Sequence, residues 1–359
     1  MQIEKQEADE MTLEEAVRKI QGPDREAMEV CRKRWNSIAK PLHSLGRLED
    51  ALIKIAGITG SADIRLDKKA LVPMCADNGV VAEGIAQSGQ DVTVIVSENF
   101  LKTKATASIM CRVAGADIFP VDIGIASDTC LINRKVAYGT KNMTKEPAMT
   151  RGQALQAIET GIDMIAELKE KGYQIIATGE MGIGNTTTSS AVASVLLGEP
   201  VENVTGRGAG LSTEGLTRKI RAIHRAIEKN QPDPADSVDV IAKVGGFDIA
   251  GLTGLFLGGA VYHVPIIIDG FISAVAALAA MSICPAVRDY MLASHVSKEP
   301  AAKMVLKKLG LPAVLHAEMC LGEGTGAVVY FQILDMACAV YNGMSTFQEV
   351  HIEEYQPLV

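Results

Sequence analysis

The chain has 359 residues, a formal net charge of -8, 48% apolar residues and only 4% aromatic residues. These values are typical of a soluble globular protein with an aliphatic core, built as one large or two medium domains. The absence of a basic stripe argues against a nucleic-acid partner. The most apolar region, residues 249–283, contains charged, proline and glycine residues, so we expect a buried helix–strand–helix and no membrane span.

Seven cysteines occur singly, without paired spacing. Such cysteines are typical of free thiols in a reducing cytoplasm, and they favour neither a disulfide framework nor a zinc site. The acidic N-terminal stretch, residues 1–16, is unlike a secretory signal. We therefore expect a cytoplasmic protein.

Apolar strands alternate with helical patterns along the chain. Thr12 and Glu15 have capping-box spacing, and Ser44 is the expected N-cap of a helix after the turn at 40–46. The other expected helices are 24–39, 92–101, 105–113, 150–171, 188–197, 212–229, 238–244, 272–281, 300–309 and 328–341. The expected strands are 70–76, 116–123, 173–177, 265–268 and 290–293. Residues 124–149 look irregular.

This alternation predicts an α/β fold with a doubly wound, mostly parallel, Rossmann-like sheet. Both ends of the chain are helical. We therefore expect a large α/β nucleotide-binding domain at 61–319 and a small helical domain formed by residues 1–60 and 320–359.

The glycine-rich stretch GEMGIGNTT at 179–187 lies between an expected strand and an expected helix. Glycine allows backbone N–H groups to approach a ligand, and a helix N-terminus adds unpaired donors and partial positive charge. This arrangement favours a phosphate site, although such turns are as often purely structural. The stretch matches neither a Walker loop nor GxGxxG.

Acids or a histidine follow several expected strands: Asp77, Glu180, Asp269 and His295. In open α/β sheets, ligands bind at the carboxyl ends of strands. His295 has no second ligand at metal-binding spacing, so it is as readily a core histidine, and we expect no metal.

Seven stretches in fixed order resemble one family. They are KPLHSLGRLE at 40–49, ADNGVVAEG at 76–84, GEMGIGNTT at 179–187, VTGRGAG at 204–210, GGFDIAGLTG at 245–254, DGFISAVAAL at 269–278 and LGEGTGA at 321–327. The family is nicotinate-nucleotide–dimethylbenzimidazole phosphoribosyltransferase, and the resemblance runs from about residue 37 to 347.

This resemblance implies transfer of phosphoribose from nicotinate mononucleotide to an aromatic base. Nicotinate leaves, and the product is an α-ribotide for cobamide biosynthesis. The resemblance also implies a dimeric active site, as a homodimer or as a heterodimer with a paralogue, and no cofactor.

The resemblance assigns roles to residues at matching positions. Glu323 corresponds to the general base, and Glu180 is a second catalytic candidate that could instead orient the loop. The residues expected to bind phosphate or ribose are Gly182, Gly184, Asn185, Thr186, Gly206, Arg207, Gly208, Lys219 and Ser294. The residues expected to line the base pocket are Ser44, Asp77, Asn78 and Gln90. For Arg207 a structural ion pair is an equal alternative, and the cations near Lys219 also fit a solvated helix face.

Four positions depart from the family's usual residues: Leu42, His43, Asn78 and Gly89. We interpret them as changes near the base that leave the sugar-phosphate motifs intact. They extend the expected acceptors from dimethylbenzimidazole to other benzimidazoles, purines and phenols. An alternative is a non-catalytic or co-catalytic subunit of a heterodimeric transferase, but a scaffold would need neither Glu323 nor GEMGIGNTT.

Overall fold

The computed structural model describes residues 11–355, so the ends of the two predicted terminal segments and most of the acidic N-terminal stretch lie outside it. Within it, one seven-stranded sheet has the order β4-β3-β1-β5-β6-β7, with β2 also paired to β1, and every pairing is parallel. The strands are β1 Lys69–Ala76, β2 Ala116–Ile118, β3 Val121–Gly124, β4 Ile132–Asn133, β5 Ile175–Met181, β6 Ile266–Ile268 and β7 Met291–Ala293.

The alternation of side chains along the strands divides the core into two. Val72 and Met74 of β1 join the cluster on one face of the sheet, whereas Leu71 and Cys75 join the cluster on the other. Successive side chains of a strand point to opposite faces. A strand that is apolar throughout, as β1 is, therefore has to be covered on both sides.

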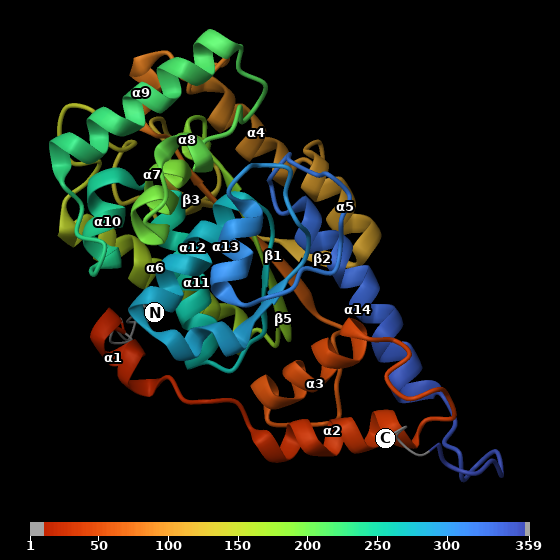
Figure 1. Ribbon diagram of the computed structural model, residues 1–359. Helices are drawn as coiled ribbons and strands as arrows, with labels where there is room; N and C mark the ends of the chain where they lie inside the picture. The colour runs from red at the N-terminus through yellow and green to blue at the C-terminus, as the bar shows by residue number, and fades with distance from the viewer. Residues whose placement is uncertain (1–10, 356–359) are drawn as a thin grey trace, which may run out of the picture.

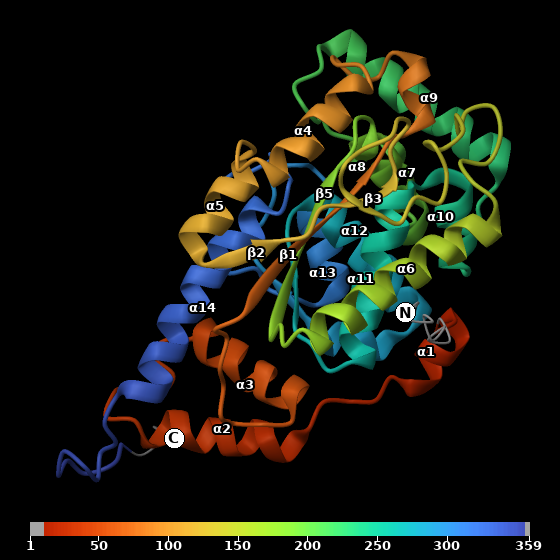
Figure 2. The same cartoon turned by 180° about the vertical axis from the view of Figure 1, so that it is seen from behind.

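Helices cover both faces, as the two opposite views show (Figures 1 and 2). The helices of the first cluster are α1 Leu13–Lys19, α6 Arg151–Glu170, α7 Asn185–Leu197, α8 Val201–Val204, α9 Thr213–Asn230, α10 Ser237–Val244, α11 Phe247–Val261, α12 Phe271–Ile283 and α13 Ala302–Leu309. The helices of the second are α2 Arg25–Ser37, α3 Arg47–Thr59, α4 Asp91–Leu101, α5 Thr106–Ala114 and α14 Thr325–Gly343. Short 3₁₀ turns occur at η1 Gly79–Glu83 and η2 Pro285–Tyr290. The predicted doubly wound parallel sheet is confirmed.

Two predicted boundaries move for local reasons. The strand expected at 116–123 is interrupted before Pro120, which has no N–H for a ladder, and forms β2 and β3. Ser44 does not cap α3: the N-cap is Gly46, without a side-chain hydrogen bond. The prediction was wrong because the turn continues past Ser44, with the Gly46 N–H donating to the His43 carbonyl at 2.9 Å.

Residues 249–283 form the expected buried helix–strand–helix: α11, β6 and α12. No helix in residues 11–355 has both the length and the apolar character needed to cross a bilayer.

The two ends of the chain meet. Ile38 and Thr346 form an antiparallel bridge, and the rings of Trp35 and Tyr341 lie 5.1 Å apart. The same apolar cluster also includes side chains of β1 and β5. The division into domains at 60 and 320 stays a prediction.

Glycines allow α6 and α11 to pack with their backbones in contact. A Cβ on Gly161 would overlap the Gly251 carbonyl oxygen and lie 2.7 Å from the Leu255 nitrogen. Backbone atoms cannot rotate away as a flexible side chain can. The separation of these two helices, and with it the first core, therefore depends on Gly161 having no side chain.

We expect Gly161→Ala to lower the free energy of unfolding by about 1–3 kcal/mol, as overpacking of a core does. Gly152→Ala is the matched control in the same helix, because its Cβ would meet nothing closer than Thr150 Oγ1 at 4.0 Å. The control should be neutral or stabilising by up to about 1 kcal/mol. Urea unfolding of both variants measures this, and equal midpoints would contradict the packing argument.

Candidate active site

The glycine-rich turn joins β5 to α7 and exposes a helix N-terminus. Gly184 is the N-cap, with φ 95°, and no side chain caps this helix. A Cβ on Gly182 would overlap the Ala76 carbonyl oxygen at the end of β1. The turn therefore needs glycine at both positions, one for close approach and one for left-handed backbone. It presents backbone donors and the positive end of the α7 dipole.

Lys219 brings a buried cation to the same turn. Its side chain comes from α9, is 1% exposed, and donates from Nζ to Thr186 Oγ1 at 2.8 Å. Burial lowers the pKa of this amine to about 8, and Glu299 opposes the shift. No ion pair of Lys219 is found among residues 11–355, so a buried ammonium lies beside an uncapped helix N-terminus. Such a pair is suited to an anion.

Two buried acids, Glu180 and Asp269, line the cavity, and a third, Asp248, interacts with Glu180. Burial raises the pKa of each carboxyl, and Asp248 raises that of Glu180 further. Glu180 accepts a hydrogen bond from the Asn185 side chain. Burial opposes the ionised form of these carboxyls, whereas the hydrogen bonds that Asp269 accepts from backbone amides favour it, and such perturbed acids are common at functional sites.

Glu323 holds a left-handed conformation, φ 62°, in the loop before α14. Its Oε2 accepts the Ala107 N–H at 3.0 Å, at the first turn of α5, which has no other side-chain cap. Burial raises the pKa of this carboxyl, while the amides of Ala107 and Thr106 lower it. Glu323 is therefore a buried carboxylate held at a helix N-terminus.

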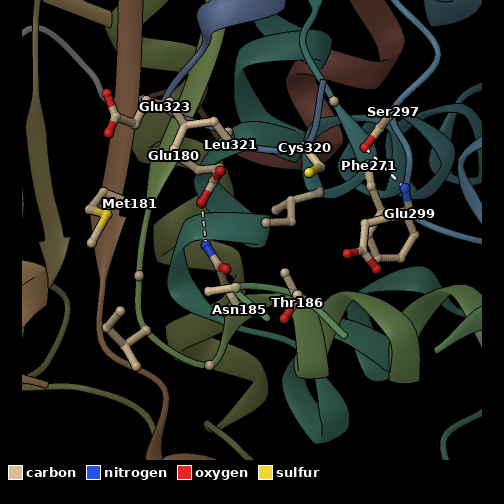
Figure 3. A pocket seen from close by; sticks show the side chains of 18 of the residues that line it. Glu180, Met181, Asn185, Thr186, Phe271, Ser297, Glu299, Cys320, Leu321 and Glu323 are labelled. Atoms are coloured by element: carbon tan, nitrogen blue, oxygen red, sulfur yellow. Dashed lines mark hydrogen bonds between the residues drawn. The ribbon is translucent and has the colours of Figure 1, made fainter. Parts of the chain in front are cut away.

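These features meet in one cavity of about 360 Å³ at the carboxyl ends of β5 and β6. Figure 3 shows Glu323 and Met181 on one side of the end of β5, with Asn185 and Thr186 on the other. Val96 of α4 and Leu321 add apolar surface to the lining. The cavity thus combines a carboxylate with apolar walls and a separate cationic turn.

Eight of the predicted site residues line the cavity: Glu323, Glu180, Gly182, Gly184, Asn185, Thr186, Arg207 and Gly208. Lys219 contacts it through Thr186. Gly206 lies against Glu299, itself a wall residue. Arg207 donates to the Leu211 carbonyl at 2.8 Å and to Thr213 Oγ1 at 3.2 Å, so its guanidinium closes its own turn.

The predicted base-pocket residues lie outside the lining. Asp77 is buried and accepts the Ala126 N–H at 2.8 Å. Asn78 is buried under the glycine-rich turn, against the positions of Gly182 and Gly184. Gln90 is half-buried and donates to the Asn78 carbonyl at 3.4 Å.

Two further predicted residues are also elsewhere. Ser44 is exposed on the turn before α3, at the end of the molecule opposite α4 and α9 (Figures 1 and 2). Ser294 is fully buried behind the cavity, where its hydroxyl donates to the Asp269 carbonyl at 3.1 Å.

Several wall residues received no role from the sequence. They include Asp269, His295, Ser297, Glu299, Cys320 and Met181. The strand-end pattern indicated Asp269 and His295, and Met181 belongs to GEMGIGNTT, whereas no local signal marks the others. Residues 11–355 contain no group of His, Cys, Asp and Glu arranged to hold a metal ion.

Comparison with known proteins agrees with this geometry. A family model described as phosphoribosyltransferase matches residues 20–352. Nicotinate-nucleotide–dimethylbenzimidazole phosphoribosyltransferase from Ruminiclostridium cellulolyticum is 51% identical over 97% of this chain and 100% of its own. The protein of that name from Acetivibrio thermocellus is 52% identical over 93% of this chain and 96% of its own.

A solved structure shows the same fold. CobT from Thermus thermophilus superposes with a TM-score of 0.87 at 36% identity, covering 92% of this chain and all of its own. The chain therefore belongs to the nicotinate-nucleotide–dimethylbenzimidazole phosphoribosyltransferase family.

Proposed function

We propose that this protein transfers phosphoribose from nicotinate mononucleotide to an aromatic base in cobamide biosynthesis. The first candidate for this base is dimethylbenzimidazole. The observation that carries the proposal is the pairing, in one cavity, of a cationic helix N-terminus with a buried carboxylate. The names of the full-length relatives support it. We place the enzyme in the cytoplasm, where it would meet both nicotinate mononucleotide and the base.

Different residues of the cavity bind the phosphate and take the proton of the base. The turn at 182–186 and Lys219 hold the 5′-phosphate, while the base lies against Met181 and Val96 near Glu323. A ring nitrogen of the base attacks C1′ of the ribose as the bond from C1′ to nicotinate breaks. Attack from the opposite side inverts the β-ribotide to α. The attacking nitrogen is the one that carries no proton, the proton on the other ring nitrogen passes to Glu323, and the bond electrons leave with nicotinate.

The experiment that tests the proposal uses the purified chain alone. Incubated with nicotinate mononucleotide and dimethylbenzimidazole, it should release nicotinate and form the α-ribotide, both followed by mass spectrometry. Activity only after addition of a paralogue would favour a co-catalytic subunit instead. An intact Glu323 beside an intact phosphate turn supports activity of the single chain.

We expect Glu323→Gln to lower kcat at least about 10²-fold, because an amide cannot take the proton. Binding of nicotinate mononucleotide should change little, since the phosphate turn is untouched. Calorimetry and turnover measure the two effects. Near-normal turnover would remove Glu323 as the base.

The pH profile gives an independent check. The base acts ionised, and burial raises its pKa above the ordinary value of about 4.3. Wild-type kcat/KM should therefore fall as pH falls through that raised pKa, at a higher pH than for an exposed glutamate. The residual kcat/KM of Glu323→Gln should not show this fall at low pH.

We also expect Lys219→Ala to weaken nicotinate mononucleotide binding by about 10- to 100-fold, the equivalent of one charge-assisted hydrogen bond. Lys229→Ala is the matched control, an exposed lysine on the same helix. Titration of the nucleotide measures both variants. If Lys219→Ala binds like the control, the phosphate lies elsewhere.

Acceptor choice belongs to the same proposal. Of the four departures from the family pattern, Asn78 is buried under the turn, and none of the four lines the cavity. The support for acceptors beyond dimethylbenzimidazole is instead the apolar wall of Val96, Met181 and Leu321, which has few groups that could select a particular ring nitrogen. Competition between equimolar dimethylbenzimidazole, adenine, phenol and p-cresol in the same assay ranks them.

A homodimer is part of the proposal. Side chains of α4, α5 and α14 expose apolar surface: Ile95 at 56%, Ile109 at 42%, Val113 at 73% and Met336 at 62%. A second copy could cover this face. Ser44, exposed and outside the cavity of its own chain, would then contribute to the base pocket of the other copy.

Complementation tests the shared site. We expect Glu323→Gln and Ser44→Tyr chains to be weakly active separately, whereas mixed dimers regain about half of wild-type activity, because one of their two sites has neither change. If the mixture stays as weak as its parents, each site is built from one chain. Sedimentation of the wild type establishes the dimer itself.

A further inference from the structure

The loop that carries Glu323 has a strained backbone. Gly322, Glu323 and Gly324 have φ of 88°, 62° and 95°, three consecutive left-handed residues. A non-glycine residue there is strained by contact of its Cβ with the backbone. Such a conformation persists only where surrounding contacts fix it.

Asp269 supplies three of those contacts from the end of β6. Its Oδ2 accepts the Gly324 N–H at 3.2 Å, and its Oδ1 accepts the N–H groups of Gly326 at 2.8 Å and Ala327 at 3.1 Å. These amides belong to the N-cap and first turn of α14. Asp269 is only 2% exposed, so few water molecules can replace it. One carboxylate thus caps α14 and fixes the residue next to Glu323.

The surrounding residues restrict Asp269 in turn. The Ser294 hydroxyl donates to the Asp269 carbonyl at 3.1 Å, and the same hydroxyl oxygen lies 3.1 Å from His295 Nδ1. The His295 ring packs against Gly326, where a Cβ would overlap Nδ1. Ser294, expected from the sequence to bind substrate, therefore supports Asp269 from behind.

We propose that Asp269 is a positioning residue that sets the orientation of the Glu323 carboxylate by clamping residues 324–327. The inference rests on the proposed function, in which Glu323 takes the proton of the base. Asp269 itself forms no bond to a reacting atom. A displacement of a catalytic group by about 1 Å can cost about 10²-fold in rate.

Asp269→Asn isolates the contact next to Glu323. An asparagine oxygen at the Oδ1 position keeps the Gly326 and Ala327 bonds, but the amide NH₂ then faces the Gly324 N–H, donor against donor. We expect kcat to fall about 10- to 100-fold, with KM for nicotinate mononucleotide within about threefold of wild type. Hydrogen exchange at residues 322–327 should become faster, which is a readout independent of activity.

A double-mutant cycle separates positioning from a general structural role. In the Glu323→Gln background, Asp269→Asn should cause little further loss, because no base remains to be oriented. If Asp269→Asn lowers kcat by the same factor in both backgrounds, the proposal is wrong. If Glu323→Gln alone is fully active, the base assignment fails instead, and the two failures are thus distinct.

Asp122→Asn is the matched control for stability. Asp122 is also a buried acid, within β3, where it accepts the Ile125 N–H at 3.0 Å and the Thr129 hydroxyl at 2.8 Å, away from the cavity lining. It should lower Tm while leaving kcat unchanged. If kcat falls with Tm in Asp122→Asn by the same proportion as in Asp269→Asn, the loss reflects stability alone and the proposal is wrong.

Discussion

Buried carboxylates held by backbone amides are the constraint on which this site depends. An ionised carboxyl taken out of water is costly unless hydrogen bonds replace its hydration. Asp269 meets that need with three amides at the start of α14, and Glu323 with the amide of Ala107 at the start of α5. Because helix N-termini offer unpaired N–H groups, the acids and the helices stabilise one another.

This arrangement links the chemistry to the fold. The parallel sheet places the ends of β5 and β6 side by side, so Glu180 and Asp269 lie beneath one cavity. Helices from both faces begin at that edge: α7 on one side, α5 and α14 on the other. The anion site and the candidate base are therefore parts of one rigid edge, which suits a reaction that requires in-line geometry.

The sheet end also separates two environments. The side of α7 offers backbone donors, Thr186 and the buried Lys219 ammonium, whereas the side of α4 and α5 offers Val96, Met181 and the Glu323 carboxylate. A charged phosphate and an apolar ring need different surroundings. A substrate that is anionic at one end, joined to an aromatic base at the other, fits this division.

The sequence by itself determined the strand–helix alternation, the parallel sheet and the glycine-rich turn before α7, because these depend on short-range patterns: apolar runs, and glycines placed between a strand and a helix. It also indicated Glu323, through a motif of contiguous residues. Only the tertiary structure decided that Ser294 lies behind the cavity, that Ser44 is exposed and that Arg207 closes its own turn. It alone brought Asp269 to a loop more than fifty residues away in sequence. Contacts between distant segments depend on how strands and helices pack, and no local spacing encodes that packing.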